Sequence, residues 1–480
     1  MIHPARRCAL LLLIITTACN RPAPPTAPAA ALTPSATASS TPMVPTPLPP
    51  TLTPTPPPTF TPTPPPTQTP RDAVVARLMP STLATLPPVG WTPTRLPAFD
   101  AEKDTPEAWV QEYIRLVTAM LNATGNVDAV LDQLMAWMPA DSTYAGARPP
   151  NAWATVRDLN ADGEDEWLIS VPARDMACGM TFCPGYLLLF HRRDGLFMPA
   201  SIIIADEQTW EVSHPVLLMV DDVNADGHPD VVIEHHECGA STCFTSLIIG
   251  QWDGQRWRDE VADPITQAYT DYTFTDDDGD GILEVVMHGG LYGSVGAGLQ
   301  RQHTLRFDWR DGAYRLVEDT PDPDPHPYFQ MLDANTALTN EDGDTALELA
   351  LAVVHYPGVY ADEGWLTPEA WARIVGYATM EAMIVYAQRG DVAAMRQLQV
   401  GLISRSDSTP SNPYPDAATA MLEAYKATGD ALAACVAAED FIAAHVDTAA
   451  FFTWYGYGTE RLTVERICPL DQAVESGPEL

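Results

Sequence analysis

Basic residues are scarce in this chain of 480 residues. It carries 26 Lys and Arg against 63 Asp and Glu, which gives a formal net charge of −37 with neutral histidines. A surface this acidic repels phosphate backbones and anionic membrane surfaces. The composition therefore argues against nucleic acid as a partner and makes cations the natural small partners, although solubility alone would also account for the charge.

Long apolar runs and the local signatures of common enzymes are lacking as well. The N-terminal apolar run, residues 9–15, is too short to span a bilayer as a helix. No GxSxG, HExxH or Walker sequence occurs. The cluster His235-His236-Glu237 lies in a β-rich run, where neighbouring side chains point to opposite faces. An ordinary strand is therefore favoured over a catalytic zinc site, and enzymatic activity is left uncertain but not favoured.

The N-terminus has the pattern of an export signal. Arg6 and Arg7 precede the apolar run, and small residues follow it up to Cys19. This order is typical of a secretory signal. The Ala-Cys ending resembles a bacterial lipobox, although Thr16 stands where an aliphatic residue is usual. We expect a signal peptide at residues 1–18 and lipidation of Cys19, with an ordinary signal cut nearby as the alternative. Either cut predicts an exported protein, and lipidation anchors it in the cell envelope with its domains exposed at the surface.

Composition changes along the chain indicate several domains. After the anchor, residues 19–75 are dominated by Pro, Thr, Ala and Ser, which predicts a disordered, extended linker. Residues 100–145 have the apolar spacing of a helical hairpin. Residues 326–472 are helical, and Gly390 and Gly429 each mark the end of one helix before the next is capped. These paired helices loosely resemble a tetratricopeptide-type α-solenoid.

Residues 150–320 have the pattern of a β repeat. Short β-rich runs are separated by turn signals at residues 193–195, 252–254 and 310–312. The spacing predicts one β unit repeated three times. The expected fold class is multidomain α+β, in which an antiparallel, propeller-like repeat of three units is flanked by the helical hairpin and by a C-terminal all-α domain, behind the disordered Pro/Thr-rich linker.

Each β unit contains an acidic loop of nine residues with oxygen-bearing groups at positions 1, 3, 5, 7 and 9. The candidate calcium ligands are Asp158, Asn160, Asp162, Glu164 and Glu166; Asp222, Asn224, Asp226, His228 and Asp230; and Asp276, Asp278, Asp280, Ile282 and Glu284. Position 7 is expected to offer its backbone carbonyl, so its side chain is free to vary.

The spacing within these loops favours calcium over magnesium and over a plain acidic turn. Glycine stands at position 6 in all three, where the backbone must curl sharply for alternate side chains to converge. Magnesium prefers rigid octahedra that retain water and is less apt. Asp, Asn and Gly also populate ordinary turns. However, the three loops recur in one phase, 64 residues apart (158 to 222) and then 54 (222 to 276), which favours cation sites.

The loops are not EF-hands. The bidentate Glu at position 12 is missing, since Ile169, Ile233 and Met287 stand there, and each loop leads into a strand. The region resembles the FG-GAP or VCBS repeats of calcium-bearing β-propellers, such as those of integrin α-subunits. The resemblance implies blades of four antiparallel strands with calcium in the hairpin between the first two. The Phe-Gly and Gly-Ala-Pro signatures are absent and three repeats are too few for the usual ring. An open array, a three-bladed array, recruitment of other strands and oligomerisation are all left open.

Six of the eight cysteines lie beyond the anchor and pair by proximity in sequence. An even number of cysteines in an exported protein predicts disulfides. Zinc is the weaker alternative, because CxxxxC is not a usual zinc spacing. The expected bonds are Cys178–Cys183, Cys238–Cys243 and Cys435–Cys468.

Together these features favour a non-enzymatic surface protein. We expect a lipoprotein that acts as a calcium-stabilised binding, adhesion or scaffold module. Its partners would be the membrane, through acylated Cys19, and a protein or glycan ligand. The rival hypotheses are an exported hydrolase acting on wall or environmental polysaccharide and a purely structural envelope lipoprotein. Neither the ligand nor the oligomeric state follows from the sequence.

Overall fold

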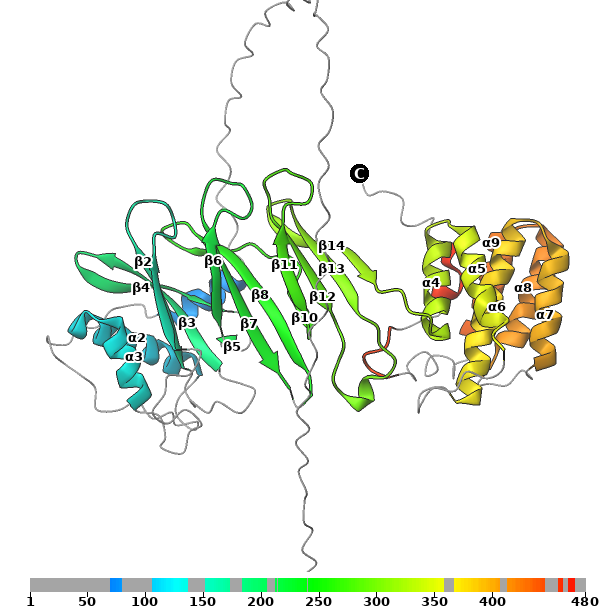
Figure 1. Ribbon diagram of the computed structural model, residues 1–480, viewed down its shortest axis with the longest axis horizontal. Coiled ribbons are helices and arrows are strands. Elements are labelled where there is room, and N and C mark those ends of the chain that lie inside the picture. The colour runs from blue at the N-terminus through cyan, green and yellow to red at the C-terminus, as the bar shows by residue number, and fades with distance from the viewer. Residues whose placement is uncertain are drawn as a thin grey trace, which may run out of the picture. The chain divides into compact units, whose positions relative to one another are not determined.

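The computed structural model describes residues 70–79, 106–136, 152–172, 184–204, 212–213, 215–239, 241–357, 367–405, 412–444, 456–460 and 465–470. These residues carry nine α-helices and three antiparallel sheets (Figure 1), so the mixed α+β class is as expected. All belong to one unit of the chain, Thr67–Leu480. The expected signal peptide, Cys19, nearly all of the linker and the pair Cys178–Cys183 lie outside the described residues. None of the described helices is long and apolar enough to cross a membrane.

Three helices precede the first sheet: α1 (Pro70–Leu78), α2 (Pro106–Thr124) and α3 (Val127–Ala136). The second and third lie within the range predicted for a helical hairpin. Gly125 turns the chain between them at φ +63°, and the Asn126 side chain caps α3 by accepting a hydrogen bond from the Asp128 amide at 2.9 Å.

The three sheets share one plan, in which four antiparallel strand positions follow one another. Sheet 1 contains β1 (Trp153–Arg157), β2 (Glu166–Pro172), β3 (Pro184–Arg193), β4 (Leu196–Ile203) and β5 (Val212–Ser213); sheet 2 contains β6 (Val216–Asp221), β7 (Asp230–Cys238), β8 (Cys243–Trp252), β9 (Trp257–Asp259) and β10 (Ile265–Ala268); sheet 3 contains β11 (Asp271–Thr275), β12 (Glu284–Gly289), β13 (His303–Arg310) and β14 (Ala313–Pro321). In sheets 1 and 2 two strands share the fourth position: β4 and β5 both pair with β3, and β9 and β10 both pair with β8.

The sheets stack face to face on apolar side chains. Leu168 of sheet 1 and Val231 of sheet 2 belong to one buried core. Val232 of sheet 2 and Val285 of sheet 3 belong to the next. Because neighbouring residues of a strand point to opposite faces, Val231 and Val232 reach different sheets. Sheet 2 is therefore buried on both sides, and Figure 1 shows the three sheets side by side.

The two outer faces of the stack are finished differently. On sheet 1, Ile169 and Leu188 pack into a core with residues of α1, α2 and α3. On sheet 3, the outward-pointing Arg306 forms ion pairs with Asp277 at 2.6 Å and Glu284 at 3.2 Å. Helices cover one end and charged side chains the other, so within the described residues the stack does not close into a ring.

The C-terminal part of the described chain is helical. It contains α4 (Pro327–Thr339), α5 (Gly343–Val354), α6 (Pro368–Gln388), α7 (Val392–Arg405), α8 (Tyr414–Thr428) and α9 (Ala431–Ala443), followed by the short 3₁₀ turn η2 (Glu465–Ile467). A further 3₁₀ turn, η1 (Val295–Ala297), lies between β12 and β13. Consecutive helices pack against one another around a single apolar core. Gly429 ends α8 in the left-handed conformation and Asp430 caps α9, as the Gly-Asp pattern predicts.

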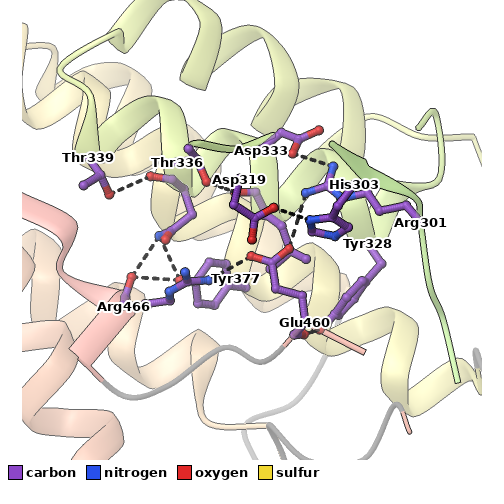
Figure 2. Close-up of polar contacts among 12 residues, drawn as sticks. Arg301, His303, Asp319, Tyr328, Asp333, Thr336, Thr339, Tyr377, Glu460 and Arg466 are labelled. Atoms are coloured by element: carbon purple, nitrogen blue, oxygen red, sulfur yellow. Dashed lines mark hydrogen bonds and ion pairs between the residues drawn. The ribbon is translucent and has the colours of Figure 1, made fainter. Parts of the chain in front are cut away.

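A buried arginine links the last sheet to the helices. Figure 2 shows Arg301, just before β13, between Asp333 of α4 and Glu460. The guanidinium pairs with Asp333 at 2.7 Å and with Glu460 at 3.4 Å, and its side chain is 4% exposed. The same Glu460 pairs with Arg466 at 3.1 Å and accepts a hydrogen bond from Tyr328 at its carbonyl. This charged network joins elements that are far apart in the sequence.

A buried acid in α6 predicts a pH dependence of stability. Glu381 is 2% exposed, and burial raises its pKa well above the usual range, with the Asn335 amide opposing the shift only in part. The native state therefore keeps the proton while the unfolded chain loses it above about pH 4.3. Stability from this group is full below that pH and falls between it and the raised native pKa, by roughly 1.4 kcal/mol per unit of pH.

Denaturant unfolding of the wild type and of Glu381→Gln at several pH values measures the contribution of Glu381 to the free energy of unfolding, since the amide does not titrate. The advantage of the variant should grow with pH. Glu369→Gln, at the exposed start of the same helix, is the control and should show no such growth. A constant difference between Glu381→Gln and the wild type would contradict the prediction.

Candidate metal-binding loops

Each acidic loop connects the first and second strands of its sheet. Residues 158–165 join β1 to β2, residues 222–229 join β6 to β7, and residues 276–283 join β11 to β12. Figure 1 shows these three connections at the same end of the stacked sheets. The shared strand order therefore places the three loops together at one end of the stack.

The backbone of each loop curls in the same two places. Positions 4 and 6 have positive φ in all three loops: Ala161 (59°), Ala225 (58°) and Gly279 (81°) at position 4, and Gly163 (89°), Gly227 (89°) and Gly281 (90°) at position 6. Alanine adopts this left-handed conformation at a cost of roughly 1–2 kcal/mol. Loops 1 and 2 adopt this conformation although alanine disfavours it. Interactions within the loop, and not the preference of the residues for turns, therefore determine its geometry.

A common set of hydrogen bonds from backbone amides to side chains holds the curl. In loop 2 the Asp222 carboxylate accepts from the Gly227 amide at 2.9 Å, and Asp226 accepts from the His228 amide at 2.9 Å. The carboxylate of Asp230 at position 9 accepts from the Val223 amide at 2.9 Å. The equivalent bonds measure 2.9, 2.8 and 2.8 Å in loop 1 and 3.2, 2.8 and 2.9 Å in loop 3. These bonds fix the orientation of the carboxylates at positions 1, 5 and 9 of each loop.

The carboxylates at position 9 are buried. Glu166, Asp230 and Glu284 are 4%, 0% and 2% exposed. Burial raises the pKa of Glu166 and of Asp230, because the charged form is cut off from water and neighbouring loop aspartates repel it. A buried charge needs an opposite charge beside it. In loop 3 Arg306 partly provides this, whereas a bound cation would provide it in every loop.

Loop 3 brings three carboxylates together. One oxygen from each of Asp276, Asp278 and Asp280 lies within 4.8 Å of the others, and all three residues are exposed. These residues could hold a metal ion, and carboxylate oxygens are the donors that hard divalent cations prefer. In loops 1 and 2 an asparagine replaces the middle aspartate, so positions 1, 3 and 5 together carry one negative charge fewer there than in loop 3.

Loop 2 has additional support that the sequence does not reveal. Gln251 of β8 donates hydrogen bonds to both oxygens of Asp226, at 3.1 and 3.3 Å, and to Asp230 at 3.4 Å. The Asn224 amide donates to Glu260 at 3.2 Å. Glu260 is 1% exposed, and burial together with the charge of Asp230 raises its pKa. These contacts fix the orientation of the ligands at positions 3, 5 and 9.

Loops 2 and 3 are also tied to each other. The Tyr314 hydroxyl lies 3.0 Å from the Val223 carbonyl and 3.1 Å from the Leu283 carbonyl. Tyr314 is fully buried between sheets 2 and 3. Tyr314 therefore links the backbone of loop 2 to the backbone of loop 3 through its hydroxyl group.

The histidine cluster on β7 does not converge. His236 pairs with Glu234 at 2.8 Å, while His235 points to the other face, where burial lowers its pKa to about 4. Glu234 also accepts a hydrogen bond from Tyr272 of sheet 3. The alternation is that of an ordinary strand.

Two of the expected cysteine pairs lie within the described residues, and both are at disulfide distance. Cys238 and Cys243 face each other at the tip of the β7–β8 hairpin with an S–S distance of 2.12 Å. Cys435 of α9 and Cys468 are 2.19 Å apart.

Comparison of the chain with protein-family models, with curated proteins and with solved structures finds no match in any of the three. The interpretation of the loops therefore depends on their own geometry.

Proposed function

We propose that the chain is an exported surface lipoprotein in which three calcium ions bind the loops and stabilise a binding or scaffold module. The observation that carries this proposal is the repetition of one geometry. Three loops at one end of the sheets share the same positive-φ residues at positions 4 and 6, the same amide-to-carboxylate hydrogen bonds and a buried acid at position 9. Calcium suits these sites because it accepts six to eight oxygens in flexible geometry.

The β repeat is proposed to consist of FG-GAP- or VCBS-like blades. Support comes from the four strand positions of each sheet, the loop between the first two strands, and the face-to-face stacking of neighbouring sheets. Among the residues that the structure describes the array is open, with α1, α2 and α3 on one outer face. The helical part is proposed to be a solenoid-like domain that extends the same scaffold.

The proposed role is binding to a protein or glycan, while acylated Cys19 anchors the chain in the membrane. Fold alone does not define function. The loops instead give the ions a physical role, which is to neutralise buried carboxylates and to stabilise the end of each sheet where the loop lies. The three stabilised loops then form a rigid surface that can bind a ligand.

Titration calorimetry with calcium on chelator-treated protein tests this proposal. We expect up to three sites with Kd values of about 10⁻⁴ to 10⁻³ M, as in other extracellular modules. Asp222→Asn and Asp276→Asn should each remove one site, because each deletes the charge at position 1 of one loop. Asp311→Asn, in the exposed β13–β14 turn, is the matched control and should leave all sites in place. Absence of calcium binding by the wild type would refute the proposal.

A further inference from the structure

A cavity of about 430 Å³ lies between loops 1 and 2. Its walls come from both loops and from the β8–β9 turn, so two β units build it together. The turn approaches loop 1 closely: a Cβ added to Gly254 would lie 3.0 Å from the Asn160 side-chain nitrogen. The volume falls within the range of small-molecule sites, roughly 300–1,000 Å³.

The wall of this cavity is polar and mixes donors with acceptors. Asn160 and Gln255 contribute amides, and Arg258 of β9 contributes a guanidinium. Asp162 and Asp226 line it as well, and both hold position 5 of a candidate metal loop. The ligand sites of the loops and the cavity are therefore one continuous structure.

The charge of the wall depends on the loops. Cations bound there would neutralise Asp162 and Asp226, which leaves Asp253 and Arg258 as charged side chains of opposite sign. Such a wall favours neither a strongly anionic nor a strongly cationic ligand. A hydroxyl group both donates and accepts, and so satisfies a wall of mixed amides, carboxylate and guanidinium.

We propose that this cavity binds a neutral, hydroxyl-rich saccharide when the loops hold their cations. The inference rests on the proposed function, because the two loops form part of the wall. The ligand is a sugar that lies between β units 1 and 2 and forms hydrogen bonds with residues of both. Arg258 is one of the groups that contact it.

Saturation-transfer NMR on the purified full-length protein in millimolar calcium tests this inference. The probes are glucose, galactose, mannose and N-acetylglucosamine, with glucosamine, glucuronate and a tri-lysine peptide as charged comparisons. At least one neutral sugar should give signals that disappear when a chelator is added. Arg258→Ala should weaken its binding by about tenfold, since a hydrogen bond from a charged group is lost.

Arg315→Ala is the matched control. Arg315 occupies in sheet 3 the register position that Arg258 has in sheet 2, since Asp308 pairs with Arg315 as Gln251 pairs with Arg258. It does not line the cavity and should leave sugar binding unchanged. Equal effects of the two substitutions, or binding unaffected by Arg258→Ala, would overturn the assignment to this cavity.

Calcium calorimetry on the same sample separates the two proposals. Normal calcium binding without a response to any neutral sugar, or with a response only to the charged probes, overturns the saccharide inference and leaves the proposed function standing. Loss of calcium binding itself refutes the proposed function. Sugar binding that persists in chelator would overturn the dependence on the loops.

Discussion

Adding calcium to chelator-treated protein is expected to stabilise the β stack strongly. At about ten millimolar calcium, sites with Kd near 10⁻⁴ to 10⁻³ M contribute roughly 1.4 to 2.7 kcal/mol each, or about 4 to 8 kcal/mol for three loops. The physical reason is that the ions bind the curled native loops and offset the burial of Glu166 and Asp230. The midpoint of thermal unfolding, followed by circular dichroism, should rise by on the order of 10 °C.

The variants divide this effect among the loops. Asp276→Asn should remove roughly one third of the calcium-dependent rise, because the other two loops are intact. Asp311→Asn neutralises another exposed acid, one that lies outside the loops, and should keep the whole rise. Magnesium at the same concentration should stabilise less, since it retains its waters and demands an octahedron. An identical midpoint in calcium and in chelator would leave the loops as acidic turns.

The features that local sequence could predict are those set by local chemistry. The turn signals at residues 193–195, 252–254 and 310–312 do connect β3 to β4, β8 to β9 and β13 to β14. β7 ends at Cys238 and β8 begins at Cys243, so this hairpin continues to its tip, where the two cysteines that were expected to pair lie at disulfide distance.

What the sequence did not predict depends on contacts between distant segments. Gln251 and Glu260 support loop 2, yet they lie 21 residues or more beyond the last ligand of that loop, Asp230. Only the pairing of β7 with β8 brings Gln251 there. Similarly, no periodicity indicates that helices cover the outer face of sheet 1 while Arg306 keeps that of sheet 3 polar. Strand order and stacking decide these features, and residue patterns within one strand do not encode them.

Removing the Cys435–Cys468 disulfide is expected to cost the helical part about 3 to 4 kcal/mol. The two cysteines are 33 residues apart, so the bond removes much of the freedom of the unfolded chain. In the native state it ties α9 to the turn η2. There the Arg466 carbonyl accepts hydrogen bonds from the Asn335 amide and the Tyr377 hydroxyl, each at 2.8 Å. Loss of the bond therefore also loosens the contacts that hold this turn on α4 and α6.

Denaturant unfolding of Cys435→Ala/Cys468→Ala measures the loss, and Cys238→Ala/Cys243→Ala is the matched control. The second pair closes a separation of only 5 residues at a hairpin tip, so its removal should cost about 2 kcal/mol. The first variant also leaves two fully buried positions smaller, which adds to its cost. A smaller loss for the 435/468 variant than for the 238/243 variant would mean that η2 is held by its hydrogen bonds alone. The helical part would then owe its stability to the core around α6, without help from the covalent link.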